Sequence, residues 1–291
     1  MMRYAFFPGC VLDGAASEAR EATVKVARAL DIELVELPGW TCCGASHAQD
    51  VDELAALAVN ARNLALAERL GLPLLTACST CTLMLRKAKA ALDGGLKDKV
   101  NKLLAAAGIS YAGTATVTHL LWALVGDYGL DRLRARATRP LAGLKVAGYY
   151  GCHILRPPQV MDFEDHARPR SLAALIAALG AEPVELASAR RCCGFHAVFP
   201  AERDAFKMTG AINADALAAG ADCVVTPCPL CQMQLDMRQR EGKAATGTAG
   251  DMPVLHLAQL VGLALGMTGG ELGLGRHVTP ADHLAAKVGG R

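Results

Sequence analysis

Ten of the eleven cysteines in this 291-residue sequence form two series with the same order and nearly the same spacing. Each series has a leading cysteine, a Cys-Cys-Gly triplet after 31 or 39 intervening residues, and a Cys-x-x-Cys pair after a further 33. The leading cysteine repeats after 142 residues and the others after 150, so the second half holds eight extra residues after Cys152. Such repetition indicates a duplicated unit with one site per half. The series are Cys10, Cys42, Cys43, Cys78 and Cys81, and Cys152, Cys192, Cys193, Cys228 and Cys231.

Thiols in this number and pattern indicate metal binding or catalysis rather than a disulfide framework. Iron–sulfur clusters and zinc are the centres that thiolates favour. A thioredoxin-like interpretation of the two Cys-x-x-Cys pairs stays open, but it leaves six repeated cysteines unexplained. A zinc site or an ordinary cubane cluster takes four ligands and leaves a fifth cysteine over in each half. Cys223 lies outside both series, within an apolar strand pattern, and is predicted to fill a core position.

The segments that precede the cysteine groups have the pattern of short buried strands, and alanine- and leucine-rich helical patterns such as 51–70 and 201–219 lie between them. This alternation predicts parallel β-α-β units, with the cysteines beyond the carboxyl ends of the strands. We expect an α/β fold of two pseudo-symmetric halves, 1–140 and 141–291, each a small, mostly parallel sheet with flanking helices and a five-cysteine cluster site at its strand ends. The expected strands are residues 4–7, 32–37, 72–77, 146–150, 183–186 and 223–226.

The repeated cysteine pattern resembles the cysteine-rich CCG domain, and two intact copies in one chain resemble the catalytic B-type subunit of heterodisulfide reductases. The resemblance implies that each series holds a noncubane [4Fe-4S] cluster, with all five cysteines of the series as ligands. Some relatives hold zinc in one copy, so zinc in one half is the lesser alternative. The resemblance further implies two partner subunits, a flavin-containing A-type subunit and a C-type subunit with cubane clusters.

Histidines and arginines near the cysteines are candidates for substrate chemistry. His153 follows a leading cysteine, and His47 and His196 follow the two Cys-Cys-Gly triplets, so all three are candidate proton donors. Arginines at three positions are candidates to hold an anionic substrate, because a guanidinium pairs well with anions. His119 and His256 precede apolar helical stretches and are predicted to be structural. The candidate catalytic residues are His153, Arg156, Arg190 and Arg191.

Composition and missing motifs narrow the possible partners. A net charge of +2, with 30 basic and 28 acidic residues and no long runs, argues against nucleic-acid binding. The sequence shows neither a signal-peptide pattern nor the roughly 18 apolar residues that span a bilayer, so we expect a cytoplasmic protein without a membrane span. No G-x-G-x-x-G motif follows a strand, and the glycine-rich segment 269–275 is expected to be a poorly structured tail. Electrons must therefore come from partner subunits.

Two functions follow from these features. The first is an oxidoreductase subunit that makes or breaks an S–S bond in a disulfide, a thiol or a sulfur-loaded carrier. A bacterial heterodisulfide-reductase-like complex of sulfur oxidation is the variant we favour from the sequence. The second is an electron-transfer subunit of a lactate, glycolate or glycerol-phosphate oxidoreductase. The space between the two clusters distinguishes them, because an open cleft suits a substrate and a sealed one suits electron transfer alone.

Overall fold

Two four-stranded parallel sheets form the centre of the two halves, as the strand pattern predicted. The computed structural model describes residues 1–45 and 47–289. The strand order is β2-β1-β3-β4 in the first sheet and β6-β5-β7-β8 in the second, and every neighbouring pair is parallel. The strands are β1 (Met2–Phe7), β2 (Ile32–Glu36), β3 (Leu74–Thr76), β4 (Val117–His119), β5 (Lys145–Gly148), β6 (Glu182–Val184), β7 (Cys223–Thr226) and β8 (Val254–His256).

This strand order reverses direction between β1 and β3, and again between β5 and β7. In open α/β sheets the crevice beyond such a reversal is where ligand-binding groups gather. Cys10 follows β1 and Cys78 follows β3, while Cys152 and Cys228 follow β5 and β7. The topology therefore directs both cysteine series to the crevices of their sheets.

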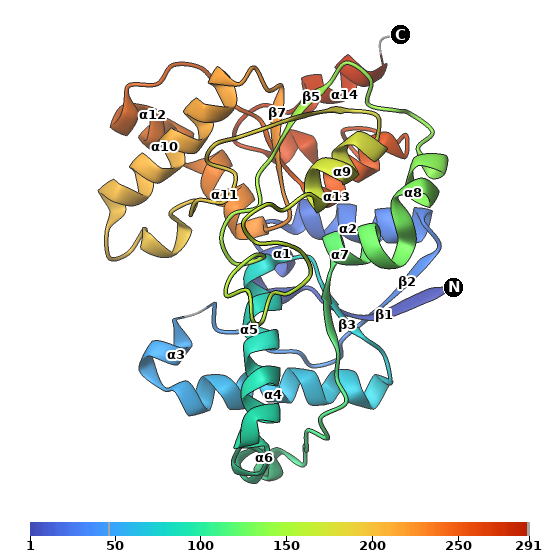
Figure 1. The fold of residues 1–291 in the computed structure, drawn as a ribbon, viewed down its shortest axis with the longest axis vertical. Coiled ribbons are helices and arrows are strands. Elements are labelled where there is room, and N and C mark those ends of the chain that lie inside the picture. The colour runs from blue at the N-terminus through green and yellow to red at the C-terminus, as the bar shows by residue number, and fades with distance from the viewer. Residues whose placement is uncertain (46, 290–291) are drawn as a thin grey trace.

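Helices cover both faces of each sheet (Figure 1). The N-cap of α4 is Asp52, whose carboxylate accepts the N–H of Ala55, and its C-cap is Gly71 in a left-handed conformation. The α5 and α11 helices begin at the two Cys-x-x-Cys pairs. The helices are α1 (Gly9–Asp13), α2 (Ser17–Ala29), α3 (Ala48–Val51), α4 (Glu53–Leu70), α5 (Ser79–Ala91), α6 (Lys97–Leu104), α7 (Leu120–Trp122), α8 (Leu130–Arg136), α9 (Ser171–Ala178), α10 (Glu202–Ala218), α11 (Pro229–Met237), α12 (Gln239–Thr246), α13 (Leu257–Ala264) and α14 (Asp282–Gly289).

The two halves share their hydrophobic cores instead of having one core each. Alternate residues of β1 point to opposite faces, so Phe6 packs into one core and Phe7 into the other. Both cores also contain residues of β5, and α2 packs against α13 where the halves meet (Figure 1). Division of the chain near residue 140 stays a prediction.

The longer connection after Cys152 crosses to the first half. We call residues 154–170 the strap. Arg86 of α5 donates from Nε to the carbonyl of Val160 at 2.6 Å and forms an ion pair with Asp162. The ring of Phe163 stacks on Trp122, with ring centroids 5.3 Å apart. The strap thus fastens the second half onto helices of the first.

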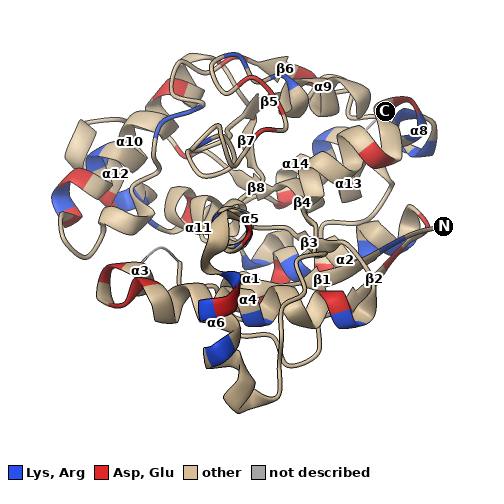
Figure 2. Cartoon of the chain, turned by 60° about the horizontal axis from the view of Figure 1, so that its bottom comes forward, with Lys and Arg blue, Asp and Glu red and all other residues tan. Residues whose placement is uncertain are grey.

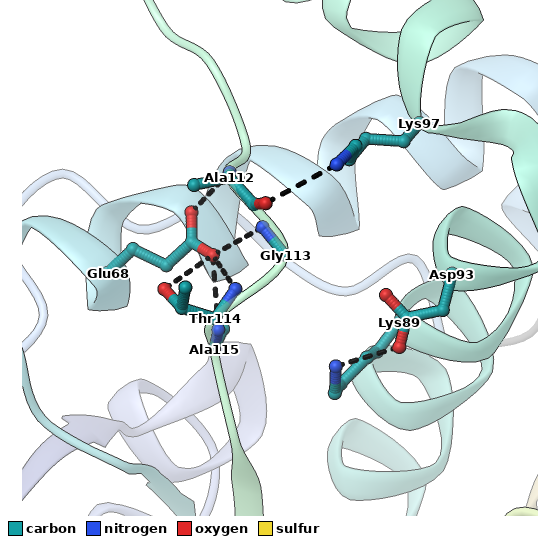
Figure 3. A network of polar contacts seen from close by, with 8 residues as sticks. All are labelled: Glu68, Lys89, Asp93, Lys97, Ala112, Gly113, Thr114 and Ala115. Carbon is teal, nitrogen blue, oxygen red and sulfur yellow. Dashed lines mark hydrogen bonds and ion pairs between the residues drawn. The ribbon is translucent and has the colours of Figure 1, made fainter.

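Glu68 fixes the segment that leads into β4 (Figure 3). Its carboxylate accepts backbone N–H groups from four successive residues, 112–115, and the hydroxyl of Thr114. These bonds hold the pKa of Glu68 below its usual value against the opposing effect of partial burial. The carboxylate therefore replaces the ladder partners that this irregular segment lacks, and sets where β4 begins.

The C-terminal segment differs from expectation. Residues 269–275 pack against the core, because Leu272 and Leu274 are fully buried and the amide of Gln259 donates to the carbonyl of Leu272. The prediction of a poorly structured tail was wrong. The prediction considered only the glycine content of this segment, whereas its two buried leucines anchor it to the core.

Two further features of the fold are the distribution of its charged residues and the length of its apolar helices. Basic and acidic residues are interspersed over the elements in the view of Figure 2, in keeping with the small net charge. Within residues 1–45 and 47–289, no helix combines the length and the apolar character needed to cross a membrane.

Candidate functional site

The cysteines of each series come together at the strand ends of their own sheet. In the first half, the sulfurs of Cys10 and Cys42 lie 3.3 Å apart, and those of Cys43 and Cys81 lie 3.4 Å apart. In the second half, all five thiols line one small cavity of about 10 Å³. We call these groups the first and second cysteine sets; they are Cys10, Cys42, Cys43, Cys78 and Cys81, and Cys152, Cys192, Cys193, Cys228 and Cys231.

The two sets meet where α5 and α11 begin. The sulfurs of Cys78 and Cys228, equivalent positions in the repeat, are 4.0 Å apart and buried. Each set is lined partly by the other half, since Leu230 borders the cavity at the first set and Thr80 borders that at the second. The cavity volumes are about 20 and 10 Å³, room for about one water molecule each. The two sets are therefore direct neighbours.

Contacts between sulfurs lower the pKa of one thiol in the first set, Cys42, and of two in the second, Cys192 and Cys228. The contact with Cys10 holds the pKa of Cys42 well below its usual range, and the contact with Cys152 does the same for Cys192. The leading cysteines show the opposite shift, to a raised pKa. The backbone N–H of Gly194 also points at Cys192, with nitrogen and sulfur 3.4 Å apart. Because the thiolate is the form that binds metal, this environment favours ligation.

Glycines before the leading cysteines leave room beside the thiols. Gly9 and Gly151 have φ angles of +73° and +71°, and an added Cβ would lie 2.9 Å from the sulfur of Cys81 and 3.2 Å from that of Cys231. The role of these two glycines was not predicted from the sequence, although each stands directly before a leading cysteine. Their lack of a side chain, and five thiols per set, fit a thiolate-bound cluster larger than a single ion.

The glycines of the Cys-Cys-Gly triplets have a different role. Gly44 and Gly194 adopt positive φ angles of +83° and +95°. An added Cβ would meet Ala48 or Ala205 at 2.7 Å, which are helix residues and not thiols. Close packing of the triplet on α3 and α10 therefore explains these glycines. Across the described part of the chain, no three His, Cys, Asp or Glu side chains form a group able to hold a single metal ion.

Three histidines from both halves gather at the second cysteine set. His153 and His196 line its cavity, and Nδ1 of His153 lies 3.0 Å from the hydroxyl of Thr80. His196 continues the row, with its Nδ1 3.4 Å from Nε2 of His47. Burial lowers the pKa of His153 and of His196, so both rings are neutral near pH 7. The structure thus brings together the three histidines that the sequence analysis proposed as proton donors.

The three candidate arginines lie outside this cavity. Arg156 donates to the carbonyl of Arg190 at 3.0 Å, and the hydroxyl of Tyr149 donates to the carbonyl of Arg191 at 2.6 Å. All three arginine side chains are exposed, and Arg190 borders a separate groove that also contains Arg168. A role for Arg156, Arg190 and Arg191 in holding an anion stays a prediction.

Cys223 lies apart from both sets. It is fully buried in β7, where it pairs in register with Val146, and burial raises its pKa to about 12. A protonated, buried thiol of this kind behaves as a small apolar side chain. Its exclusion from the ligands stays a prediction with this geometry in its favour.

Comparison with known proteins identifies the family. The family of the cysteine-rich domain, CCG, matches residues 4–86 and 146–236, which contain the two cysteine sets. The 8-methylmenaquinol:fumarate reductase membrane anchor subunit of Wolinella succinogenes is 52% identical over 97% of this chain and 98% of its own. The B-type subunit of a ferredoxin/F420H2-dependent CoB-CoM heterodisulfide reductase from Methanosarcina acetivorans is 33% identical over 99% and 97%, respectively.

Two further relatives agree with this assignment. A protein of Archaeoglobus profundus, named for its likeness to the B-type subunit of heterodisulfide reductase, is 34% identical over 99% of this chain and 98% of its own. The crystal structure of a hypothetical protein from Helicobacter pylori has the same fold, with a TM-score of 0.79 at 15% identity; the match covers 96% of this chain and 52% of that one. The chain belongs to the CCG cysteine-rich domain family, as a tandem protein related to the B-type subunit of heterodisulfide reductase.

Proposed function

We propose that this chain is an iron–sulfur subunit that carries electrons through two adjacent cluster sites in a multisubunit reductase. A quinol is the proposed electron donor and a fumarate-type reductase the proposed complex, on the strength of the 52% identity with the Wolinella protein. This proposal favours the electron-transfer alternative of the sequence analysis, with a different complex from the three considered there.

The observation that carries the proposal is the contact between the two sets. Cys78 and Cys228 touch at 4.0 Å in a buried position, so the two sites are adjacent. Electron transfer between two sites needs such proximity. Two one-electron sites also match the two electrons that a quinol releases when it is oxidised.

The residues of the chain fit this role. Bound iron–sulfur clusters would supply one-electron redox steps at thiolate-ligated iron. The ten cysteines of the two sets would be the ligands, and Gly9 and Gly151 would let the backbone pass close to them. Leu230 and Phe195 limit access of water to the sites. The flavin-containing and cubane-cluster subunits, the noncubane cluster type and a cytoplasmic location belong to the proposal as well.

Thiol/disulfide chemistry is the second candidate, and the row of histidines favours it. His153 lies beside the second set, and its neutral ring could accept the proton of a substrate thiol as a general base. The relatives at 33% and 34% identity bear heterodisulfide reductase names. In this candidate, Arg156, Arg190 and Arg191 hold the anionic thiol, and a sulfur-oxidising complex stays open. Under the first candidate the arginines are free to contact a partner subunit.

Anaerobic purification with the partner subunits separates the two candidates. We expect about eight irons per chain, with matching sulfide, if both sites hold four-iron clusters. A water-soluble quinol should reduce the clusters, as followed by EPR, and thiols should leave the spectra unchanged. New EPR signals with a thiol, together with turnover of a disulfide that slows in an Arg190→Ala/Arg191→Ala double variant, would favour the second candidate. Stoichiometric zinc without sulfide in both halves would contradict both.

A further inference from the structure

Two buried histidines occupy equivalent places in the duplicated fold. His119 ends β4 and pairs in register with Thr76, and His256 ends β8 and pairs with Thr226. Both side chains are fully buried. The sequence analysis noted them only as structural residues before helices. Their contacts go beyond their own helices.

Each ring makes the same two hydrogen bonds. Nδ1 of His119 accepts the N–H of Leu121 at 2.9 Å, and Nδ1 of His256 accepts the N–H of Ala258 at 3.3 Å, so each histidine caps the helix that follows. With Nδ1 as acceptor, the ring proton of a neutral histidine is on Nε2. Burial keeps both rings neutral, and Nε2–H is therefore a donor.

The Nε2 bonds cross between the halves in a reciprocal manner. His119 donates to the carbonyl of Pro227 at 3.0 Å, and His256 donates to the carbonyl of Ala77 at 2.9 Å. These carbonyls belong to the residues directly before Cys228 and Cys78, the two cysteines whose sulfurs meet at 4.0 Å. Each half therefore holds the Cys-x-x-Cys loop of the other half.

We propose that His119 and His256 are positioning residues that fix the separation of the two cluster sites, so that electron exchange between the sites depends on their cross-half hydrogen bonds. This inference rests on the proposed electron-transfer function and names the residues that hold the two sites at a fixed separation. Helix capping alone does not require histidine, because Asn, Asp, Ser and Thr are the better caps. Histidine adds a donor on the far side of the ring, and only this donor reaches the other half.

Two types of substitution, histidine to Asn and histidine to Gln, test the helix cap and the cross-half bond separately. In His119→Asn and His256→Asn, the shorter side chain keeps an acceptor for the cap but lacks the reach to the other half. In His119→Gln and His256→Gln, the longer side chain places an N–H donor at that reach and gives up the cap. The Asn and Gln variants are thus opposite tests of the same position.

The first measurement uses the cluster-loaded chain with its partner subunits under anaerobic conditions. We expect the Asn double variant to retain its iron, to lose most of the magnetic interaction between the reduced clusters seen by EPR, and to equilibrate electrons between the sites severalfold more slowly. The Gln double variant should stay close to the wild type. Unchanged magnetic interaction in the Asn variant, or equal loss in the Asn and Gln variants, would overturn the proposal.

The second measurement uses cluster-free protein and does not depend on redox function. Amide hydrogen exchange should speed up crosswise, at Cys228, Leu230 and Cys231 in His119→Asn and at residues 77–81 in His256→Asn; Pro227 and Pro229 have no amide N–H. Faster exchange in the half that carries the substitution, without an effect on the other half, would overturn the positioning role. If the wild-type complex holds no iron, the proposed function fails together with the electron-exchange role, and the exchange pattern still decides the positioning role.

Discussion

Replacement of Gly9 by alanine tests whether the backbone must pass close to the thiols of the first cysteine set. Gly9 has a φ angle of +73°, and an alanine Cβ would lie 2.9 Å from the buried sulfur of Cys81. Gly220 is a matched control, because its φ angle is +70° and nothing lies within 4 Å of an added Cβ. Both substitutions have the same backbone strain, but only Gly9→Ala presses on a predicted ligand.

The expected magnitudes follow from these two contributions. A left-handed backbone conformation costs an alanine roughly 1 to 2 kcal/mol, which applies to both variants. Extra volume in a packed site adds roughly 1 to 3 kcal/mol, which applies to Gly9→Ala alone. The cluster-free Gly9→Ala chain should therefore lose roughly 2 to 5 kcal/mol of its free energy of unfolding, against roughly 1 to 2 kcal/mol for Gly220→Ala.

Denaturant unfolding of the cluster-free chains and iron analysis of anaerobically purified chains measure the two effects. Gly220→Ala should retain all its iron, whereas Gly9→Ala should lose about half, the share of the first cluster if each set holds one. Equal losses of stability in the two variants, with full iron in both, would refute the reasoning. In that case the closeness of Gly9 to Cys81 would have no bearing on a cluster.

Three further outcomes are expected. Cys223→Ser should keep the full iron content in anaerobic preparations, whereas Cys193→Ser should lose the second cluster; equal losses would make Cys223 a ligand. Burial lowers the pKa of His119 to about 3 and of His256 to about 4, so the unfolded chain takes up protons first below pH of about 6.5. The contribution of the two histidines to the free energy of unfolding is the difference in urea unfolding between the cluster-free wild type and the His119→Asn/His256→Asn chain. It should be constant above that pH and fall toward pH 4, with a slope approaching about 1.4 kcal/mol per pH unit for each histidine; a difference independent of pH would contradict their neutral burial. Glu68→Ala should lower the free energy of unfolding by about 1.5 to 3 kcal/mol in the same assay, because four backbone N–H groups lose a charged acceptor, and an unchanged value would mean that water replaces it fully.

Local sequence patterns were sufficient to predict the sheets and the sites at their ends. The expected strand at residues 72–77 corresponds to β3, Leu74–Thr76, and the expected helix 51–70 begins at Glu53, because Asp52 caps it. Strand alternation and helical periodicity indicate which face of a single element is buried. The spacing of the cysteines indicates which strand ends carry the cysteines. The fourth strands, β4 and β8, were not among the expected strands.

These patterns could not predict how the two halves pack against each other. The cross-half bonds of His119 and His256 depend on how one half sits on the other, and no periodicity within either half encodes that placement. The cap function of each histidine is local, and the sequence analysis accordingly identified both only as structural residues. Arg156, which belongs to the strap, likewise lies outside the second cavity, and the strap turns toward the first half.

The strap also bears on how a duplicated chain acquires two distinct halves. In two identical domain copies related by a twofold axis, the same substitution has the same effect in either copy. In this chain the two copies are not equivalent. Arg86 and Trp122 of the first half bind the strap, and the first half has no connection of equal length. Replacement of Phe163 would leave Trp122 without its stacking partner. We therefore expect the two copies to have diverged under different constraints once the longer connection was in place.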